Sequence, residues 1–375
     1  MIVFEKYTFK KIFMFWAKKF LEEILTYISE NNFSDLHLTS GRKARIRNRI
    51  GDLEEIEKIW EKKLVDFTKE NVFEIIKVML TEEDLEYFLK EKEIDFSYKI
   101  PDKDRFRVNC FFDSSGYSIA FRLITADIPT MEELGLWEWI KEMCKKQKWL
   151  ILVTWPTGSW KSTNLASMID FINKNYKKHI ITIEDPIEFA FESDKSLIHQ
   201  REVWAHTKSF ERAIKSALRE DPDVIMVGEM RDSETIKSAI TLAETGHIVF
   251  STLHTNDSVQ TVDRIVDVFP SSQQAQIRMQ LSQSLIWIIS QRLVPRSDNK
   301  WRIAVREILV ANEAVRNLIL SWKTHQLYSI LEVGKDNWMI LMDKYLLALY
   351  AKWLITKEVV LAYARDKDSV ELMIS

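Results

Sequence analysis

The sequence predicts an α/β protein built from two unequal domains. Between residues 94 and 124, short segments alternate apolar and polar residues, which is typical of antiparallel strands. From about residue 150 to residue 253, continuous apolar runs alternate with amphipathic helices, a pattern typical of a parallel sheet buried on both faces. The chain has 375 residues, of which 46% are hydrophobic, so it is large enough to form two separate cores.

The first domain is predicted to combine helices with an antiparallel sheet. An amphipathic helix in "FLEEILTYISENNFSDLHL" leads into an apolar alternation, and Gly51 supplies a turn between two short strand-like pieces. Two helical stretches follow, and then three strands, "IDFSYKI", "RFRVNCFF" and "YSIAFRLI", joined by the turns "PDKD" and "DSSG". We expect this domain to span residues 17–125, after an extension of residues 1–16 and before a linker at 126–130 that contains Pro129.

The second domain is predicted to hold a parallel sheet. Its expected strands are "LILVT", "HIITIE", "DVIMV" and "HIVFSTL", and helices such as "SFERAIKSALRE" separate them. In that helix one face is shared by Phe210, Ala213, Ile214, Ala217 and Leu218. We expect this domain to span residues 131–270. From residue 271 to residue 375, successive amphipathic segments, beginning with "SQSLIWIISQRL", predict an almost wholly helical region.

Composition and charge exclude several classes of protein. A formal net charge of -3 argues against a broad cationic face, so we expect no nucleic acid partner. The two cysteines, Cys110 and Cys144, stand far apart without a CxxC pair, which favours a reduced, cytoplasmic chain without disulfides. No apolar run reaches the roughly 18 residues that a membrane span needs, and Glu5, Lys6 and Lys10 interrupt the apolar N-terminus. We therefore expect neither a transmembrane segment nor a signal peptide.

A phosphate-binding loop is the first chemical motif. Residues 149–163 read "WLILVTWPTGSWKST", in which a strand and a helix flank a near match to the Walker A pattern GxxxxGK[ST]. In that pattern backbone N–H groups cradle phosphate, the lysine reaches the β- and γ-phosphates, and the hydroxyl holds Mg²⁺. Gly158, Lys161 and Ser162 conform, whereas Trp155 and Trp160 stand at the two defining glycine positions. A left-handed backbone there would cost about 1 to 2 kcal/mol per residue, so the loop as written should not hold ATP.

Four longer motifs, in order along the chain, indicate a family. They are "DLHL", "TIEDPIEF" at 182–189, "SALREDPDVIMVGEMRD" at 216–232 and "AETGHIVFSTLHTND" at 243–257. With glycine at positions 155 and 160, the loop "GPTGSGKST" and these motifs resemble the secretion ATPase superfamily over nearly the whole chain from residue 17. The segment "AVRNLI" at 314–319 is similar to the AIRNLI signature of type IV pilus retraction ATPases, and the sequence lacks the tetracysteine element usual in extension ATPases.

This resemblance implies a fold, an activity and partners. The implied fold is a RecA-like P-loop NTPase domain with a small N-terminal PAS-like α+β domain and a helical C-terminal region. The implied activity is hydrolysis of ATP, with Mg²⁺, by a homo-hexameric motor that drives pilus retraction and twitching motility. Such a motor would work at the cytoplasmic face of the inner membrane, against a membrane platform protein of the pilus machinery.

The resemblance also implies the residues of the nucleotide site. The phosphate loop would consist of Trp155, Pro156, Thr157, Gly158, Ser159, Trp160, Lys161, Ser162 and Thr163. Lys161, Glu188, Glu229 and His254 would be catalytic: Glu188 resembles the general base, Glu229 stands at the Walker B position, and His254 lies in the His box beside a second candidate, His247. Ser162 and Glu229 would hold Mg²⁺. Arg107 and Arg122 resemble arginines that reach the nucleotide from the first domain, although strand arginines that face solvent would give the same pattern.

Tryptophan stands where this family has glycine. The chain contains 13 tryptophans and 8 glycines, whereas glycine usually makes up roughly 7% of a protein. Nine tryptophans occupy expected glycine positions: Trp149, Trp155, Trp160, Trp204, Trp287, Trp301, Trp322, Trp338 and Trp353. Turns and helix ends favour a residue without Cβ. Our hypothesis is that UGA codons, read as glycine in the source organism, are written here as tryptophan; Trp16, Trp60, Trp137 and Trp139 remain unassigned.

Two other functions stay open at this point. An extension or type II secretion ATPase would share the nucleotide chemistry and differ in its partner. A catalytically dead regulatory subunit of the ring would follow if the native chain carries the tryptophans.

Overall fold

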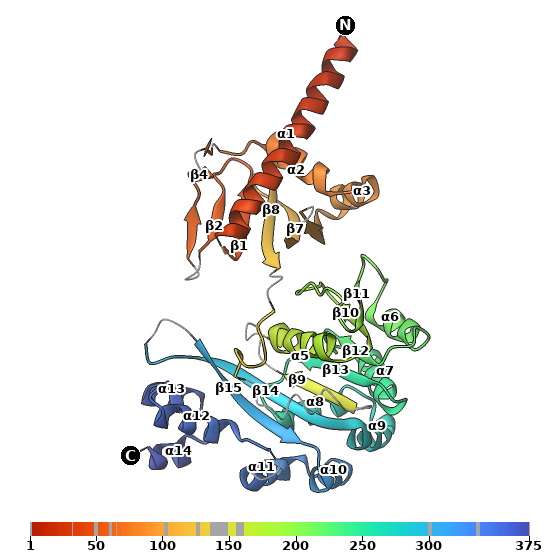
Figure 1. Ribbon diagram of the computed structural model, residues 1–375, viewed down its shortest axis with the longest axis vertical. Helices are drawn as coiled ribbons and strands as arrows, with labels where there is room; N and C mark the ends of the chain where they lie inside the picture. Colours follow the sequence, from red (N-terminus) through yellow and green to blue (C-terminus); the bar gives the residue numbers. More distant parts are fainter. Residues whose placement is uncertain are drawn as a thin grey trace. The chain divides into compact units, whose positions relative to one another are not determined.

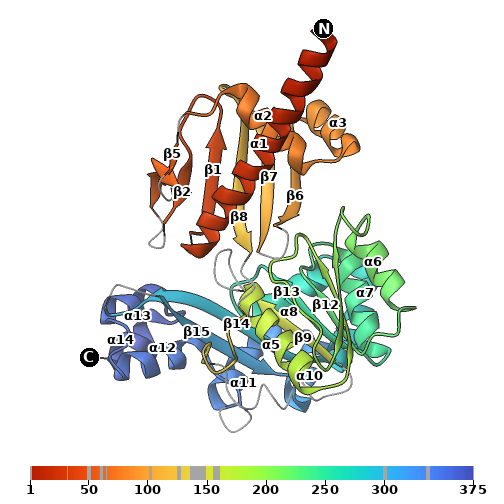
Figure 2. The ribbon, with the colours of Figure 1, turned by 45° about the horizontal axis from the view of Figure 1, so that its top comes forward.

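The computed structural model describes residues 2–31, 33–48, 52–59, 62–64, 66–100, 104–124, 128–135, 149–154, 161–298, 302–334 and 338–374. For residues 2–14, 62, 63 and 161 this description covers the backbone alone. The chain divides into an N-terminal unit, Met1–Asp127 with Glu188–Ala190, and a second unit, Ile128–Ile187 with Phe191–Ser375 (Figures 1 and 2). The predicted linker at 126–130 falls at this division, and its first two residues lie outside the described ranges.

The N-terminal unit is built on a six-stranded antiparallel sheet with the strand order β3-β2-β1-β8-β7-β6. Its strands are β1 (Asp35–Thr39), β2 (Arg45–Arg47), β3 (Leu53–Glu55), β6 (Glu93–Lys99), β7 (Arg105–Asp113) and β8 (Gly116–Ile124). A separate two-stranded ribbon pairs β4 (Lys58–Ile59) with β5 (Lys62–Lys63). The helices are α1 (Ile2–Glu30), α2 (Lys69–Met79) and α3 (Glu82–Glu91).

The core of this unit lies between its helices and one face of the sheet. Leu21, Ile24 and Ile28 of α1 are fully buried in one cluster with apolar side chains of the strands. In β7 the alternation predicted from the sequence is present, because Phe106 and Val108 are buried in that cluster while Arg107 between them is exposed. The predicted order of helix, short strands, two helices and three antiparallel strands is therefore confirmed.

The second unit contains a seven-stranded sheet with the order β11-β10-β12-β13-β9-β14-β15. Its strands are β9 (Trp149–Thr154), β10 (His179–Glu184), β11 (Leu197–Glu202), β12 (Val224–Val227), β13 (Ile248–Leu253), β14 (Leu285–Pro295) and β15 (Arg302–Val310). Neighbouring strands run parallel except β15, which pairs antiparallel with β14. The predicted parallel sheet is thus present, with one antiparallel strand added at its edge.

Helices cover both faces of this sheet, and the side chains of β9 show how the two layers form. Ile151 and Val153 join a cluster with α5 (Lys161–Asn175), whereas Leu150 and Leu152 join a cluster on the opposite face. The helices of the opposite face are α6 (Phe210–Ala217), α7 (Ser233–Glu244), α8 (Ser258–Asp267), α9 (Ser271–Ser284), α10 (Glu313–Leu320) and α11 (Leu327–Val333).

The prediction of an almost wholly helical region from residue 271 is wrong for residues 285–295 and 302–310, which form strands. The segment "SLIWIISQRL" becomes strand β14 instead of a helix, because its β-branched apolar residues pair in parallel with the buried strand β9. A short apolar run does not by itself distinguish a buried strand from a buried helix. Helices return after β15 with α10, the 3-10 turn η1 (Thr324–Gln326), α11, α12 (Met342–Ala351), α13 (Lys357–Tyr363) and α14 (Lys367–Met373).

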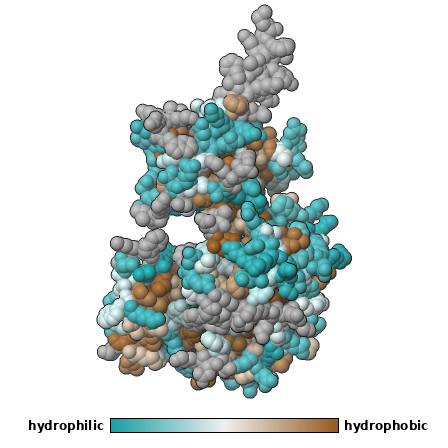
Figure 3. Space-filling view, viewed as in Figure 1, coloured by the Kyte–Doolittle hydropathy of each residue, from teal (hydrophilic) through white to brown (hydrophobic). Residues whose placement is uncertain are grey.

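Most of the described surface that Figure 3 draws is hydrophilic, and apolar residues on it gather at the lower left, over α12 to α14. These last helices pack their own small core, which includes Met342, Leu346 and Val360, against Val294 and Val305 of the hairpin β14–β15. No helix within the described ranges is long and apolar enough to cross a bilayer.

We predict that Phe250→Ala destabilises the second unit strongly. The Phe250 ring is fully buried beneath α5 in the centre of β13, and removing such a ring costs about 3 to 5 kcal/mol. Thermal denaturation should therefore show a melting temperature well below that of the parent chain. Leu372→Ala is the control, since Leu372 is 82% exposed; equal melting temperatures for the two variants would contradict this packing.

Candidate functional site

The carboxyl ends of four parallel strands lie along one edge of the second unit's sheet. These strands, β9, β10, β12 and β13, end at Thr154, Glu184, Val227 and Leu253. Thr154 pairs directly with Leu253, and Val227 pairs with Ser251. The segments that follow these strands therefore leave the sheet together, at the edge where open α/β sheets bind their ligands.

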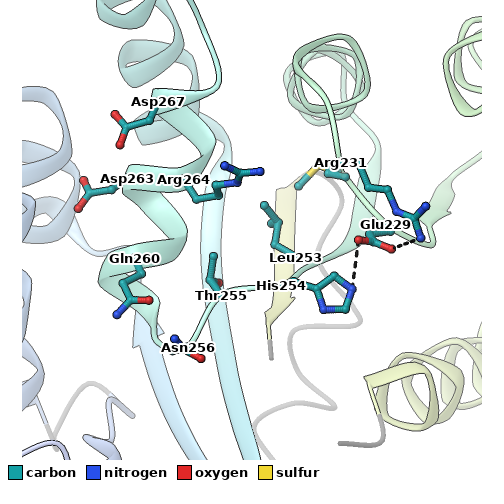
Figure 4. Close-up of a pocket in the computed structure, with 11 residues that line it drawn as sticks. Glu229, Arg231, Leu253, His254, Thr255, Asn256, Gln260, Asp263, Arg264 and Asp267 are labelled. Atoms are coloured by element: carbon teal, nitrogen blue, oxygen red, sulfur yellow. Dashed lines mark ion pairs between the residues drawn. The ribbon is translucent and has the colours of Figure 1, made fainter. Parts of the chain in front are cut away.

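Two residues predicted from sequence meet at this edge. Glu229 follows β12 and His254 follows β13, and the structure places His254 Nε2 3.1 Å from Glu229 Oε1 (Figure 4). The second oxygen, Glu229 Oε2, lies 2.9 Å from Nη2 of Arg231. One carboxylate thus holds an imidazole on one side and a guanidinium on the other, and all three side chains remain reachable by solvent.

Backbone contacts fix the turn that carries Glu229. The N–H of Gly228 donates to Ile183 O at 2.8 Å, and the N–H of Met230 donates to Thr252 O at 3.0 Å. A Cβ at position 228 would lie 3.2 Å from Ile183 O, so a side chain there would push the turn away from β10. Glu229 is therefore held between two hydrogen-bonded neighbours.

A cavity of about 510 Å³ opens beside this carboxylate, between the loop after β13 and helix α8. In Figure 4 Arg264 extends from α8 toward the side where Glu229 lies, whereas Asp263 and Asp267 project from the other side of the helix. The lining residues are Glu229, Met230, Arg231, Leu253, His254, Thr255, Asn256, Gln260, Asp263, Arg264 and Asp267. Acidic and basic groups therefore both line this cavity.

A buried carboxyl group positions the start of α8. Oε1 of Glu307, on β15, accepts hydrogen bonds from the backbone N–H of Ser258 at 2.9 Å and from its hydroxyl at 2.8 Å. Burial raises the pKa of Glu307, and the two Ser258 donors oppose that rise only in part. Because α8 carries Gln260 and Arg264, Glu307 sets the position of one wall of the cavity.

Hydroxyl groups connect the strands beneath the same edge. Thr154 and Ser290 are 2.7 Å apart, and Thr255 and Thr261 are 2.6 Å apart, each pair measured between hydroxyl oxygens and each buried. Thr261 also donates to Asp257 O at 2.7 Å. These bonds satisfy buried polar groups and link β9 to β14, and the loop after β13 to α8.

The predicted phosphate loop lies partly outside the described residues. Residues 155–160, which include Trp155, Pro156, Thr157, Gly158, Ser159 and Trp160, are not described, and only the backbone of Lys161 is. Helix α5 begins at Lys161, with Ser162 and Thr163 half-buried in its first turn. A helix N-terminus presents unpaired backbone N–H groups, which bind anions well.

Two acidic residues at and after the end of β10 have different surroundings. Glu184 is buried and accepts hydrogen bonds from the Thr182 hydroxyl at 2.6 Å and from Nε2 of Gln200 at 3.2 Å. Glu188 is exposed and belongs to the N-terminal unit. Its role as general base stays a prediction. Glu202, which the sequence did not indicate, accepts the Ile187 N–H at 3.2 Å and so helps to hold this loop.

Arg107 and Arg122 lie directly opposite one another on β7 and β8 of the N-terminal unit. Asp35, the first residue of the "DLHL" motif, pairs with Arg122 on the other side, and its Oδ1 is 2.8 Å from Arg122 Nε. Arg47 lies opposite Asp35 in turn, with Nε 3.8 Å from Oδ2. Opposed like charges destabilise a sheet, and the buried carboxylate of Asp35 offsets them.

His247, the second candidate in the His box, lies at the opposite end of β13 from His254, and its role stays a prediction. It precedes β13 whereas His254 follows it, and a strand of that length separates the two by about 20 Å. The His247 N–H donates to Leu242 O at 3.3 Å, at the end of α7. Two histidines seven residues apart in the sequence stand at opposite ends of an extended strand.

Sequence reasoning missed Arg231, Arg264, Glu307 and Asp35 as contributors. Arg231 and Asp35 both lie inside the family motifs, and Arg231 stands two residues after Glu229. Arg264 and Glu307 come from elements whose spatial neighbours the sequence does not reveal. No cluster of three or more His, Cys, Asp or Glu side chains suited to a metal ion occurs in the described part of the chain.

Comparison with known proteins gives concordant matches. A family model described as "Type II/IV secretion system protein" matches residues 15–337. The "Type IV pilus retractation ATPase PilT" of Pseudomonas aeruginosa is 44% identical over 350 residues, which are 93% of this chain and 98% of the relative. A solved structure described as "Crystal Structure of the Pilus Retraction Motor PilT and Bound ADP" is 42% identical, covers 94% of this chain and 99% of its own, and has a TM-score of 0.86. The "Type IV pilus assembly ATPase PilB" of Thermus thermophilus is 38% identical over 198 residues, which are 51% of this chain and 21% of the relative.

We predict that Glu307→Gln makes the chain progressively more stable than its parent as the pH rises. A carboxyl group whose pKa is higher in the folded state binds more protons when folded, so its contribution to stability falls above its unfolded pKa of about 4.3. Glutamine keeps an oxygen that can accept from Ser258 but does not titrate. Melting temperatures measured between about pH 4 and pH 8 should diverge, while those of Glu371→Gln, an exposed control, should follow the parent. A constant difference between Glu307→Gln and the parent would contradict the raised pKa.

Proposed function

Because this chain belongs to the type II/IV secretion system protein family, we propose that it is an ATP-hydrolysing motor that drives retraction of a type IV pilus. The observation that carries this proposal is the carboxylate of Glu229, which contacts both His254 and Arg231 at the carboxyl edge of the sheet. Helix α5 comes after β9 in the chain, and β9 pairs with β13, the strand that precedes His254. Both therefore follow neighbouring strands at the same edge of the sheet. An acidic side chain, an imidazole and a helix N-terminus suit a triphosphate and its metal ion.

ATP would bind with its phosphates against the N-terminus of α5. The first backbone N–H groups of that helix and the ammonium group of Lys161 would carry positive charge against the β- and γ-phosphates. In this proposal the fold of the second unit is RecA-like, and residues 155–163 form its phosphate loop. The solved relative described as holding bound ADP supports a nucleotide at a site of this kind.

The residues present fit a magnesium ion. Ser162 offers a hydroxyl in the first turn of α5, and Glu229 offers a partly exposed carboxylate. Oxygen ligands of this type suit Mg²⁺, which usually takes one or two protein ligands and completes its shell with phosphate and water. When bound, Mg²⁺ neutralises charge on the phosphate oxygens.

Hydrolysis would proceed by in-line attack of water on the γ-phosphorus, with cleavage of its bond to the bridging oxygen and departure of ADP. Glu188 would accept a proton from the attacking water. His254, oriented by Glu229, would contact the γ-phosphate and respond to its loss. Lys161 would stabilise the charge that develops on the transferred group.

The N-terminal unit would complete the site in an assembled ring. Asp35 holds Arg122 in place beside Arg107, and two exposed guanidinium groups suit the charge of a transferring phosphoryl group. In this proposal the unit is PAS-like, the ring is a homo-hexamer, and loss of the γ-phosphate moves one domain against its neighbour. The ring would pull pilin from the pilus through a platform protein, at the cytoplasmic face of the inner membrane.

Retraction fits better than extension. The similarity to the retraction ATPase of Pseudomonas aeruginosa extends over nearly the full length of both chains, whereas the similarity to the assembly ATPase covers about half of this chain. A dead, regulatory subunit remains the second candidate, because Trp155 and Trp160 occupy the glycine positions of the loop.

We predict that Glu229→Gln lowers kcat for ATP hydrolysis by about 100-fold or more. The parent for this test carries Trp155→Gly and Trp160→Gly, because the loop as written would exclude phosphate. Loss of the Glu229 charge removes a magnesium ligand and releases His254, so steady-state phosphate release should fall while the chain stays folded. Glu358→Gln, an exposed carboxylate on α13, is the control and should match the parent. An unchanged kcat in Glu229→Gln would contradict the site.

We predict that cells lacking this gene carry excess pili and do not twitch. Without retraction, pili extend but are not withdrawn, which electron microscopy of the cell surface and a motility assay would detect. Complementation with Glu229→Gln should fail where the parent gene succeeds. Loss of surface pili on deletion would contradict retraction and indicate an extension motor.

A further inference from the structure

Tryptophan accounts for most of the left-handed backbone at non-glycine residues. Among the residues that the structure describes, six non-glycine residues have positive φ, and four of them are Trp204, Trp322, Trp338 and Trp353, with φ between 59° and 71°. The other two are Lys92 and Asp221. Four of the six described glycines also have positive φ. These tryptophans therefore share the conformation of the chain's glycines, which is strained for a bulky side chain.

Three helices in the described part of the chain end in the same motif. Helices α7, α10 and α12 each place a left-handed residue two positions beyond their last residue, and these residues are Gly246, Trp322 and Trp353. In each case the next N–H donates to the carbonyl five residues back: His247 to Leu242, Lys323 to Leu318 and Leu354 to Leu349. This is the Schellman motif, whose left-handed position is usually glycine. Among these three helices, glycine takes the left-handed position once and tryptophan takes it twice.

Trp204 and Trp338 occupy turns that also have a left-handed backbone at the tryptophan. Trp204 begins the turn between Val203 and Thr207, and its N–H donates to Thr207 O at 2.6 Å. Trp338 precedes Met339, whose N–H donates to Gly334 O at 3.1 Å. The rings of the four left-handed tryptophans project outward, with exposed fractions of 78%, 52%, 58% and 81% for Trp204, Trp322, Trp338 and Trp353. Burial of the indole therefore does not explain their presence.

Ring contacts explain these positions only in part. The guanidinium of Arg278 lies 4.1 Å from the Trp322 ring centroid, and Tyr350 stacks obliquely on Trp353 with the centroids 6.4 Å apart. Neither contact requires a left-handed backbone. Trp16, Trp149 and Trp287 lie in a regular helix or strand, so their backbone does not distinguish tryptophan from glycine.

We propose that the native chain carries glycine at positions 204, 322, 338 and 353, and that a glycine codon is written as tryptophan in this sequence. The same substitution at positions 155 and 160 would turn "WPTGSWKST" into "GPTGSGKST", a complete Walker A sequence. This proposal concerns the identity of residues and stands whether or not the chain retracts a pilus.

Peptide masses of the protein purified from its source cells test the proposal. Trypsin releases the four positions in the peptides 202–208, 317–323, 336–344 and 353–357, and position 155 with position 160 in the peptide 149–161. We expect each of the first four masses to be lower by the difference between one tryptophan and one glycine, and fragment spectra to place glycine at the stated position. Tryptophan in those peptides overturns the proposal.

A stability series on the full recombinant chain tests the backbone requirement separately. Gly246→Ala adds a Cβ that meets no atom within 4 Å, so it measures the strain alone, and it should lower the melting temperature by about 2 to 4 °C. Trp353→Ala should melt below Trp353→Gly by a similar amount, because both lack the ring and only alanine keeps Cβ. In helix α1 the order should reverse, with Trp16→Gly below Trp16→Ala. If Trp353→Gly melts below Trp353→Ala, position 353 is not built for glycine and the proposal fails there.

Discussion

The parallel alignment of β9, β10, β12 and β13 is the constraint on which the rest of the second unit depends. Parallel strands end on the same side of a sheet, so four segments that are far apart in the sequence leave it together. The register then sets the finer spacing, since Thr154, the last strand residue before the predicted phosphate loop, pairs with Leu253, the residue before His254. The carboxylate of Glu229, held by the bonds of Gly228 and Met230, lies one strand away. The chemistry proposed for this edge follows from that alignment.

One buried carboxylate, that of Asp35, stands in a row of arginines on the sheet of the N-terminal unit. Asp35 lies between Arg47 and Arg122 on neighbouring strands, and Arg107 continues the row. Three guanidinium groups in one row of a sheet repel one another. Asp35 offsets this at Arg47 and Arg122, and Asp95 Oδ1 lies 3.8 Å from Nε of Arg107, while Arg122 and Arg107 stay exposed. The motif that helped to identify the family from sequence therefore has a physical role, because its aspartate holds an arginine in place.

Sequence reasoning succeeded where local pattern decides the structure. The alternation in β7 and the continuous apolar runs of β10, β12 and β13 are local patterns, so these strands could be predicted, and with them the positions of Glu229 and His254 at the strand ends. It failed for β14, because an apolar run of that length fits either a buried helix or a buried strand, and only the pairing with β9 decides between them. The sequence spacing also did not reveal that the extended strand β13 places His247 at the opposite end from His254. Glu307 could not be found at all, because its partner Ser258 lies 49 residues away in the chain.

The central claim is that the native chain binds ATP at the carboxyl edge of the second unit's sheet. The most direct test is equilibrium binding of ATP, in the presence of Mg²⁺, to protein purified from the source cells, measured by titration calorimetry on a sample shown to be folded. Our account predicts saturable binding that weakens when Mg²⁺ is removed, because the metal ion and the helix N-terminus both act on the phosphates. A folded native chain that shows no binding at any accessible ATP concentration would contradict it, and would leave a member of this family that has lost its nucleotide site.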